Sequence, residues 1–159
     1  MVREAAARLY DVDHDSVVMN KLTQSGKYDT GTVTFRARKD KLIDLDKLHE
    51  SVWATRLSAG TSSGLVSLEV TAVGEVVVDE KETVLKVRGS TAHFVLAKNP
   101  DEPHQAVFDQ LRAALDRGEK LVTVTGRIDG WSGLWPKVLR TLPPQPRRIL
   151  LTSFEKVTE

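Results

Sequence analysis

The stretch that decides the fold is residues 65–97, which read LVSLEVTAVGEVVVDEKETVLKVRGSTAHFVLA. Apolar and polar residues alternate over 65–78, and this period of two predicts one long strand with a buried face. Gly74 lies where the alternation breaks, which indicates a bulge or a sharp bend in that strand. Two shorter strands, over 83–87 and 91–97, are predicted next, joined by a glycine turn.

The chain downstream of this stretch continues with a helix and two more strands. Pro103 suits the first turn of the helix, and Gly118 suits its end. The buried face of the helix is predicted to consist of Val107, Phe108, Leu111, Ala114 and Leu115. Strands are predicted over 120–127 and 149–154, with a long irregular loop between them.

This order of elements resembles the OB-fold, a five-stranded barrel with a helix between its third and fourth strands. The resemblance covers residues 64–159 and rests on the order of the elements. It implies that the bend at Gly74 is where the first strand coils around the barrel. It also implies that the loop between the last two strands takes part in binding single-stranded nucleic acid or sugars.

The N-terminal part reads as a shorter mixture of strands and helices. The pattern predicts a helix over 2–10, a strand over 16–22, a turn over 24–29 and a strand over 31–38. A helix follows, with Asp44 as its N-cap and Gly60 as its C-terminal cap. Its apolar stripe is predicted to be Leu45, Leu48, Val52 and Leu57, with Trp53 beside it.

The GTVTF segment at Gly31–Phe35, followed by Asp-Leu-Asp-Lys-Leu at 44–48, resembles the later part of a heavy-metal-associated domain. That family is a ferredoxin-like βαββαβ sandwich whose metal loop carries two cysteines after its first strand. Here that first strand is missing and the chain has no cysteine, so the resemblance implies the architecture without soft-metal binding. We therefore expect an α+β protein with a ferredoxin-like part over 1–63 and an OB-like barrel over 64–159.

Composition and charge argue against several classes of function. The chain of 159 residues has 23 Lys and Arg against 22 Asp and Glu, so it lacks the basic excess of a dedicated duplex-DNA binder. The absence of cysteine excludes disulfides, thiolate zinc sites and cysteine nucleophiles. No apolar run is long enough to span a membrane, so we expect a soluble protein. The cytoplasm is the default compartment, and an extracytoplasmic one is open if a signal peptide was removed.

No sequence motif for catalysis or metal binding is found. The four histidines, His14, His49, His93 and His104, include no pair at the i, i+4 spacing of a helical metal site. There is no nucleophile elbow, P-loop or Rossmann fingerprint. The acidic loop at Asp11, Asp13 and Asp15 could hold a hard cation, but a solvated loop is the favoured interpretation. We expect no enzyme, with His93 or His49 as a base being the catalytic alternative.

The most informative stretch for function is residues 130–148, GWSGLWPKVLRTLPPQPRR. Its aromatic and basic side chains suit base stacking, phosphate contact or a protein partner. The predicted contact surface consists of Trp131, Trp135, Lys137, Arg140, Arg147 and Arg148. In the structural alternative, the tryptophans and leucines of this loop fold it onto the barrel as a plug. A second basic patch, at Arg36, Arg38, Lys39 and Lys41, is expected to be a solvated face.

These observations favour a non-catalytic binding or assembly module that uses the aromatic-basic loop of an OB-like domain. A protein partner or self-association is the expected interaction, with no cofactor and no membrane. One alternative is single-stranded nucleic-acid binding, which would weaken steeply with salt. Another is a divergent metal-handling domain that uses histidines and carboxylates instead of cysteines.

Overall fold

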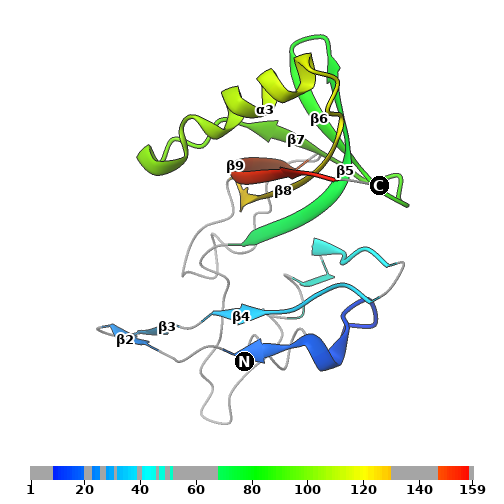
Figure 1. Cartoon of the computed structure of the whole chain (residues 1–159). Coiled ribbons are helices and arrows are strands. Elements are labelled where there is room, and N and C mark those ends of the chain that lie inside the picture. The colour runs from blue at the N-terminus through cyan, green and yellow to red at the C-terminus, as the bar shows by residue number, and fades with distance from the viewer. Residues whose placement is uncertain are drawn as a thin grey trace. The chain divides into compact units, whose positions relative to one another are not determined.

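The computed structural model describes residues 9–19, 23–25, 28–30, 32–38, 41–45, 47–48, 51, 68–129 and 147–157. The chain divides into two compact units. The described residues up to 51 belong to unit 1, and those from 68 onward belong to unit 2. The protein is of mixed α+β class (Figure 1). The predicted boundary between residues 63 and 64 lies outside the described residues.

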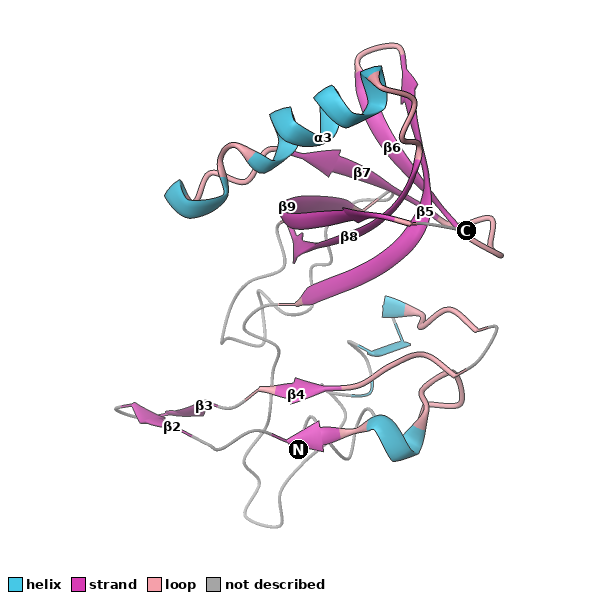
Figure 2. Ribbon diagram, in the orientation of Figure 1, coloured by secondary structure: helices cyan, strands magenta, loops and turns pink. Residues whose placement is uncertain are grey.

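Unit 2 is a five-stranded sheet with one α-helix (Figure 2). Its elements are β5 (Glu69–Asp79), β6 (Glu82–Val87), β7 (His93–Ala97), the 3₁₀ helix η2 (Glu102–His104), α3 (Val107–Asp116), β8 (Leu121–Ile128) and β9 (Arg148–Lys156). The strands are hydrogen-bonded in the order β5-β6-β7-β9-β8, and β5 also pairs with β8, so the sheet closes on itself. The β7–β9 pair is parallel, and the other pairs are antiparallel. The predicted strands and helix of this unit are confirmed to within a few residues.

Gly74 is where β5 passes from one neighbour to the other. Residues 69–75 pair with β8 and residues 74–79 pair with β6, so Gly74 is bonded on both sides. A Cβ atom at this position would overlap the carbonyl oxygen of Lys86, which explains the glycine. Both registers run without interruption, so the predicted bulge is wrong, whereas Figure 2 shows β5 as a curved ribbon. The bulge lies between β8 and β9, at Thr125 and Gly126.

The core of unit 2 lies between the closed sheet and α3. The sheet contributes buried side chains from every strand: Val76, Leu85, Phe94, Leu96, Val122, Val124, Ile128, Ile149 and Leu151. Of the predicted buried face of α3, Leu111 and Ala114 are buried, whereas Val107, Phe108 and Leu115 are half-buried. The Arg112 guanidinium donates to the hydroxyl of buried Thr83 over 3.1 Å and ties α3 to β6. Gly118, at φ +85°, ends the helix in the left-handed conformation that glycine tolerates best.

Unit 1 contains an antiparallel hairpin made of two successive strand pairs. β1 (Val18–Met19) pairs with β4 (Val33–Thr34), and β2 (Thr23–Ser25) pairs with β3 (Tyr28–Thr30). A single bridge between Val12 and Ala37 extends this pairing toward the base of the hairpin. In the turn predicted over 24–29, residues 24–25 belong to β2 and 28–29 to β3, so the prediction is wrong there, and residues 26–27 lie outside the described residues.

The other predictions for unit 1 hold in part. The strand predicted over 31–38 is reduced to β4 and the bridge at Ala37, although its alternation of half-buried and exposed residues is confirmed. Of the strand predicted over 16–22, Val18 and Met19 form β1 and Ser16 belongs to the 3₁₀ helix η1 (His14–Ser16), while residues 20–22 lie outside the described residues. Leu9 and Tyr10, the described end of the helix predicted over 2–10, are not helical, and residues 2–8 lie outside the described residues.

The predicted N-cap at Asp44 is confirmed. Its carboxylate accepts from the Lys47 N–H at 3.2 Å, and its carbonyl accepts from the Leu48 N–H at 3.0 Å. The described residues after it, among them Leu45 and Leu48, are helical, and Leu48 is buried. The predicted stripe residues Val52 and Leu57, with Trp53 and the cap Gly60, lie outside the described residues.

Candidate functional site

The aromatic-basic loop is attached to unit 2 at a fixed base. Its central residues Trp131, Trp135, Lys137 and Arg140 lie outside the described residues. At its two ends, the Asp129 N–H donates to the Arg148 carbonyl at 2.8 Å. The Val95 N–H donates to the Arg147 carbonyl at 2.9 Å. The connection between β8 and β9 therefore leaves and rejoins the sheet at one point of the closed ring.

The two arginines at the end of this loop have different environments. Arg148, the first residue of β9, is exposed, whereas Arg147 is only 3% exposed. The Arg147 side chain thus lies inside the protein at the base of the loop, and Arg148 presents its charge to solvent. Sequence reasoning placed both on one contact surface, and the structure brings only Arg148 to the surface of unit 2.

The outer face of β7 and β9 is partly covered by the chain itself. Alternation along the strands places Ala97 and Leu150 on the same face as exposed His93, yet they are 7% and 6% exposed. Asp101, just after β7, forms an ion pair with Arg127 of β8 at 3.7 Å. The register aligns Ala97, Leu150 and Arg127 across the sheet. This end of the outer face is consequently not an open ligand surface.

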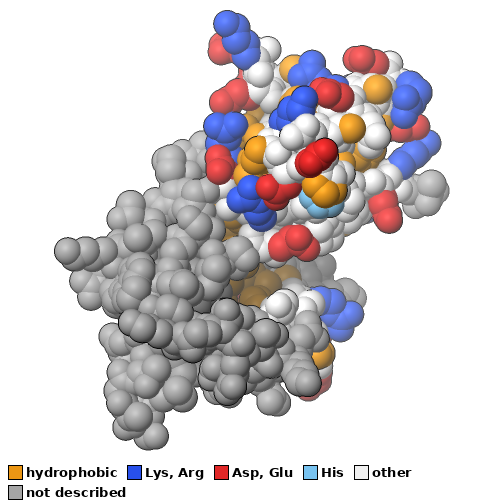
Figure 3. Space-filling model, turned by 90° about the vertical axis from the view of Figure 1, so that its left-hand side faces the viewer, with side chains coloured by type: hydrophobic (Ala, Val, Ile, Leu, Met, Phe, Trp, Pro, Cys, Tyr) orange, Lys and Arg blue, Asp and Glu red, His pale blue; other side chains and the backbone are white. Residues whose placement is uncertain are grey.

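The turn between β5 and β6 is acidic. It consists of Asp79, Glu80, Lys81 and Glu82, and Glu80 adopts a φ of +52°. Figure 3 shows Asp and Glu side chains interspersed with Lys and Arg over the described surface that faces the viewer. A phosphate backbone would meet like charge at this turn, so the turn does not suit nucleic-acid contact.

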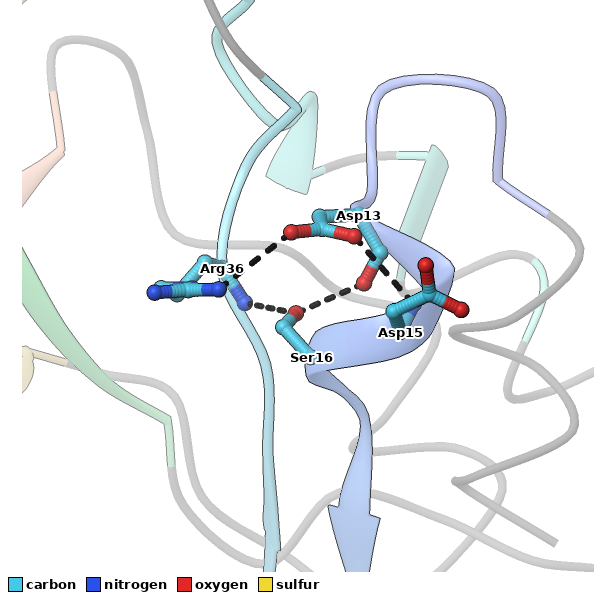
Figure 4. Close-up of polar contacts among 4 residues, drawn as sticks. All are labelled: Asp13, Asp15, Ser16 and Arg36. Carbon is cyan, nitrogen blue, oxygen red and sulfur yellow. Dashed lines mark hydrogen bonds and ion pairs between the residues drawn. The ribbon is translucent and has the colours of Figure 1, made fainter.

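The acidic loop of unit 1 is held in place by hydrogen bonds and an ion pair (Figure 4). Asp13 accepts from the Asp15 N–H at 3.2 Å and pairs with the Arg36 guanidinium at 3.4 Å. The Ser16 hydroxyl donates to the Asp13 carbonyl at 2.6 Å and accepts from the Arg36 N–H at 2.8 Å. These contacts join η1 to the opposite arm of the hairpin and occupy the Asp13 carboxylate.

The histidines do not form a metal site in the described part of the chain. Among the described residues, no group of three or more His, Asp or Glu side chains is placed to hold a metal ion. His14 Nε2 lies 3.1 Å from the Leu9 carbonyl oxygen, His93 is exposed on β7, and His104 lies in η2. His49 lies outside the described residues.

Sequence reasoning missed a cluster at the base of the hairpin. Tyr10 is 68% exposed, and the Arg38 guanidinium carbon lies 4.9 Å from the centroid of its ring. The Lys41 ammonium nitrogen lies 5.8 Å from the same centroid. The basic run was visible in the sequence, but its contact with Tyr10 depends on pairing between distant segments.

Comparison of the chain with known protein-family models, with curated proteins and with solved structures gives no significant match. None of the described helices is both long and apolar enough to cross a membrane.

Proposed function

We propose that unit 2 is an OB-like barrel. The supporting observation is the order β5-β6-β7-β9-β8, with α3 inserted between the third and fourth strands of the unit. In that arrangement, the β5–β6 turn and the β8–β9 connection are the two loops that OB-folds use for binding. The ferredoxin-like arrangement of residues 1–63 is a separate prediction. The described hairpin strands and helical residues supply some of its elements.

The proposed function is a non-catalytic binding or assembly module. Its contact surface is the aromatic-basic loop, with Trp131 and Trp135 as anchors and Lys137, Arg140 and Arg148 around them. The observation that carries the proposal is the fixed base of this loop, where backbone hydrogen bonds from Asp129 and Val95 hold its returning end. Long loops held on a rigid scaffold are frequent binding elements, and tryptophan is enriched at the energetic centre of protein interfaces.

The partner that we propose is a protein, with a second copy of this chain as the first to test. The balanced charge of the chain suits contact with a protein surface better than contact with a polyanion. Sedimentation velocity over a hundredfold range of concentration, chosen to bracket micromolar affinity, tests this directly. We expect association that Trp131→Ala with Trp135→Ala weakens and that Tyr10→Ala, an exposed aromatic of unit 1, leaves unchanged. Association that persists in the double tryptophan variant contradicts the proposal.

Single-stranded nucleic acid is the second candidate ligand, and the OB-like strand order is the observation that favours it. The acidic β5–β6 turn opposes it, since that turn would border the bound strand. Intrinsic tryptophan fluorescence during titration with a mixed single-stranded oligonucleotide decides the matter. A salt-sensitive quench would put nucleic acid first. No change at low salt would remove this candidate and leave the protein partner.

A further inference from the structure

The base of the unit 1 hairpin brings the side chains of Tyr10, Arg38 and Lys41 together. The Arg38 N–H donates to the Asp11 carbonyl at 2.7 Å, which brings Arg38 beside Tyr10. The Lys41 N–H donates to the Arg38 carbonyl at 2.9 Å, which keeps Lys41 close to Arg38. Backbone hydrogen bonds therefore build the cluster from two distant segments of the chain.

The cluster faces solvent and presents hydrogen-bond donors. Tyr10 is among the most exposed large side chains in the described residues, and Arg38 and Lys41 are also exposed. An arginine stacked on an aromatic ring keeps the N–H groups at the edge of its planar guanidinium free. Lysine adds a compact positive charge with three more donors, and the tyrosine hydroxyl adds one.

Among the described residues, no carboxylate forms an ion pair with the charges of the cluster. In the part of the chain that the structure describes, neither Arg38 nor Lys41 forms an ion pair, although two aspartates lie close in sequence to Tyr10. Asp13 is engaged by Arg36 instead. Two cations that share one ring repel each other, and an anion bound between them would relieve that repulsion.

We propose that Tyr10, Arg38 and Lys41 form a binding site for phosphate groups, carried by a free polyphosphate or by a nucleic-acid backbone. Planar guanidinium groups bind phosphate oxygens through two parallel hydrogen bonds, and lysine and tyrosine are frequent phosphate ligands beside them. The site uses none of the residues of the aromatic-basic loop, so the proposal does not rest on the function proposed for that loop.

The test is a titration of the ¹⁵N-labelled full chain with pyrophosphate and, separately, with a short single-stranded oligonucleotide. Binding is followed by the NMR shifts of the Arg38 side-chain N–H and of the hairpin amides. The test variant is Arg38→Gln with Lys41→Gln. The matched control, Lys81→Gln with Lys120→Gln, removes the same charge from two exposed positions of unit 2. Arg38→Lys keeps the charge but removes the planar fork.

We expect the hairpin signals to shift, with affinity reduced roughly tenfold or more in the test variant and little changed in the control. The affinity of Arg38→Lys should lie between those of the test variant and the control. Its hairpin amide shifts without ligand should match those of the unaltered chain. Saturation by pyrophosphate identifies free phosphate as sufficient, and binding of the oligonucleotide alone identifies the backbone as the source. Equal affinity of the test variant and the control overturns the proposal, as does the absence of hairpin shifts with both ligands.

Discussion

At the scale of single residues, two glycines make the closed sheet of unit 2 possible. A Cβ at Gly74 would overlap the carbonyl oxygen of Lys86, and one at Gly126 would overlap that of Leu150. Both obstacles are backbone atoms of neighbouring strands, which cannot turn aside as a flexible side chain can. The spacing of the strands at these two points therefore depends on the missing side chain.

We expect Gly74→Ala and Gly126→Ala each to lower the free energy of unfolding of unit 2 by about 2–3 kcal/mol, as overpacked core positions do. Gly89→Ala is the control, because a Cβ there meets no atom within 4 Å and only its φ of +75° is unfavourable. Its cost should be about 1 kcal/mol. Urea unfolding followed by circular dichroism measures all three. Equal losses of unfolding free energy in all three variants would show that the strands shift to make room for the added Cβ.

Glu80 is a position where a glycine should stabilise unit 2. Its φ of +52° is unfavourable for any side chain with a Cβ. We expect Glu80→Gly to raise the unfolding free energy of unit 2 by roughly 0.5–1 kcal/mol. Lys81→Gly, one residue later and not at positive φ, should lower it by a similar amount through the greater freedom of the unfolded chain. A loss of stability in Glu80→Gly would argue against the turn conformation.

At the scale of elements, the sequence predicted unit 2 better than unit 1, for a physical reason. The strands of unit 2 are long enough for alternation to show, as in β8, where buried and half-buried residues alternate throughout. In unit 1, alternation over 31–38 predicted one long strand, whereas the structure has the two-residue β4 and the bridge at Ala37 there. The hairpin exists because distant segments pair, and local pattern carries no record of that pairing.

The packing of α3 is an element-scale prediction. Leu111 is fully buried in the face that α3 turns to the sheet, while the neighbouring Gln110 is exposed. We expect Leu111→Ala to lower the unfolding free energy of unit 2 by about 2–5 kcal/mol. Gln110→Ala should change it by no more than about 0.5 kcal/mol. Thermal and urea unfolding check both, and a small effect of Leu111→Ala would mean that α3 is not part of the core.

The candidate sites show the same limit of sequence reasoning. The aromatic-basic loop could be found from composition alone, because tryptophans and arginines gather in one stretch. The burial of Arg147 could not be found in this way, since its neighbour Arg148 has the same chemistry and is exposed. The Tyr10 cluster could not be predicted from the sequence either, because hairpin pairing brings Tyr10 and Arg38 together.

At the scale of the whole molecule, the chain has two compact units and two candidate contact surfaces. The closed sheet of unit 2 fixes the base of the aromatic-basic loop, of which residues 132–141 fall in unit 1. The hairpin of unit 1 carries a cationic cluster around an exposed tyrosine. The proposed assembly role requires the first of these surfaces only. A variant that loses phosphate binding should therefore keep its association, and the reverse should hold for the tryptophan variant.

The measurement that tests the central claim most directly is hydrogen–deuterium exchange of the full chain at dilute and at associating concentrations. The account predicts that protection on association is concentrated in residues 130–148, with the hairpin of unit 1 unchanged. Association that protects another part of the chain and leaves 130–148 as it was would contradict the claim that this loop is the contact surface.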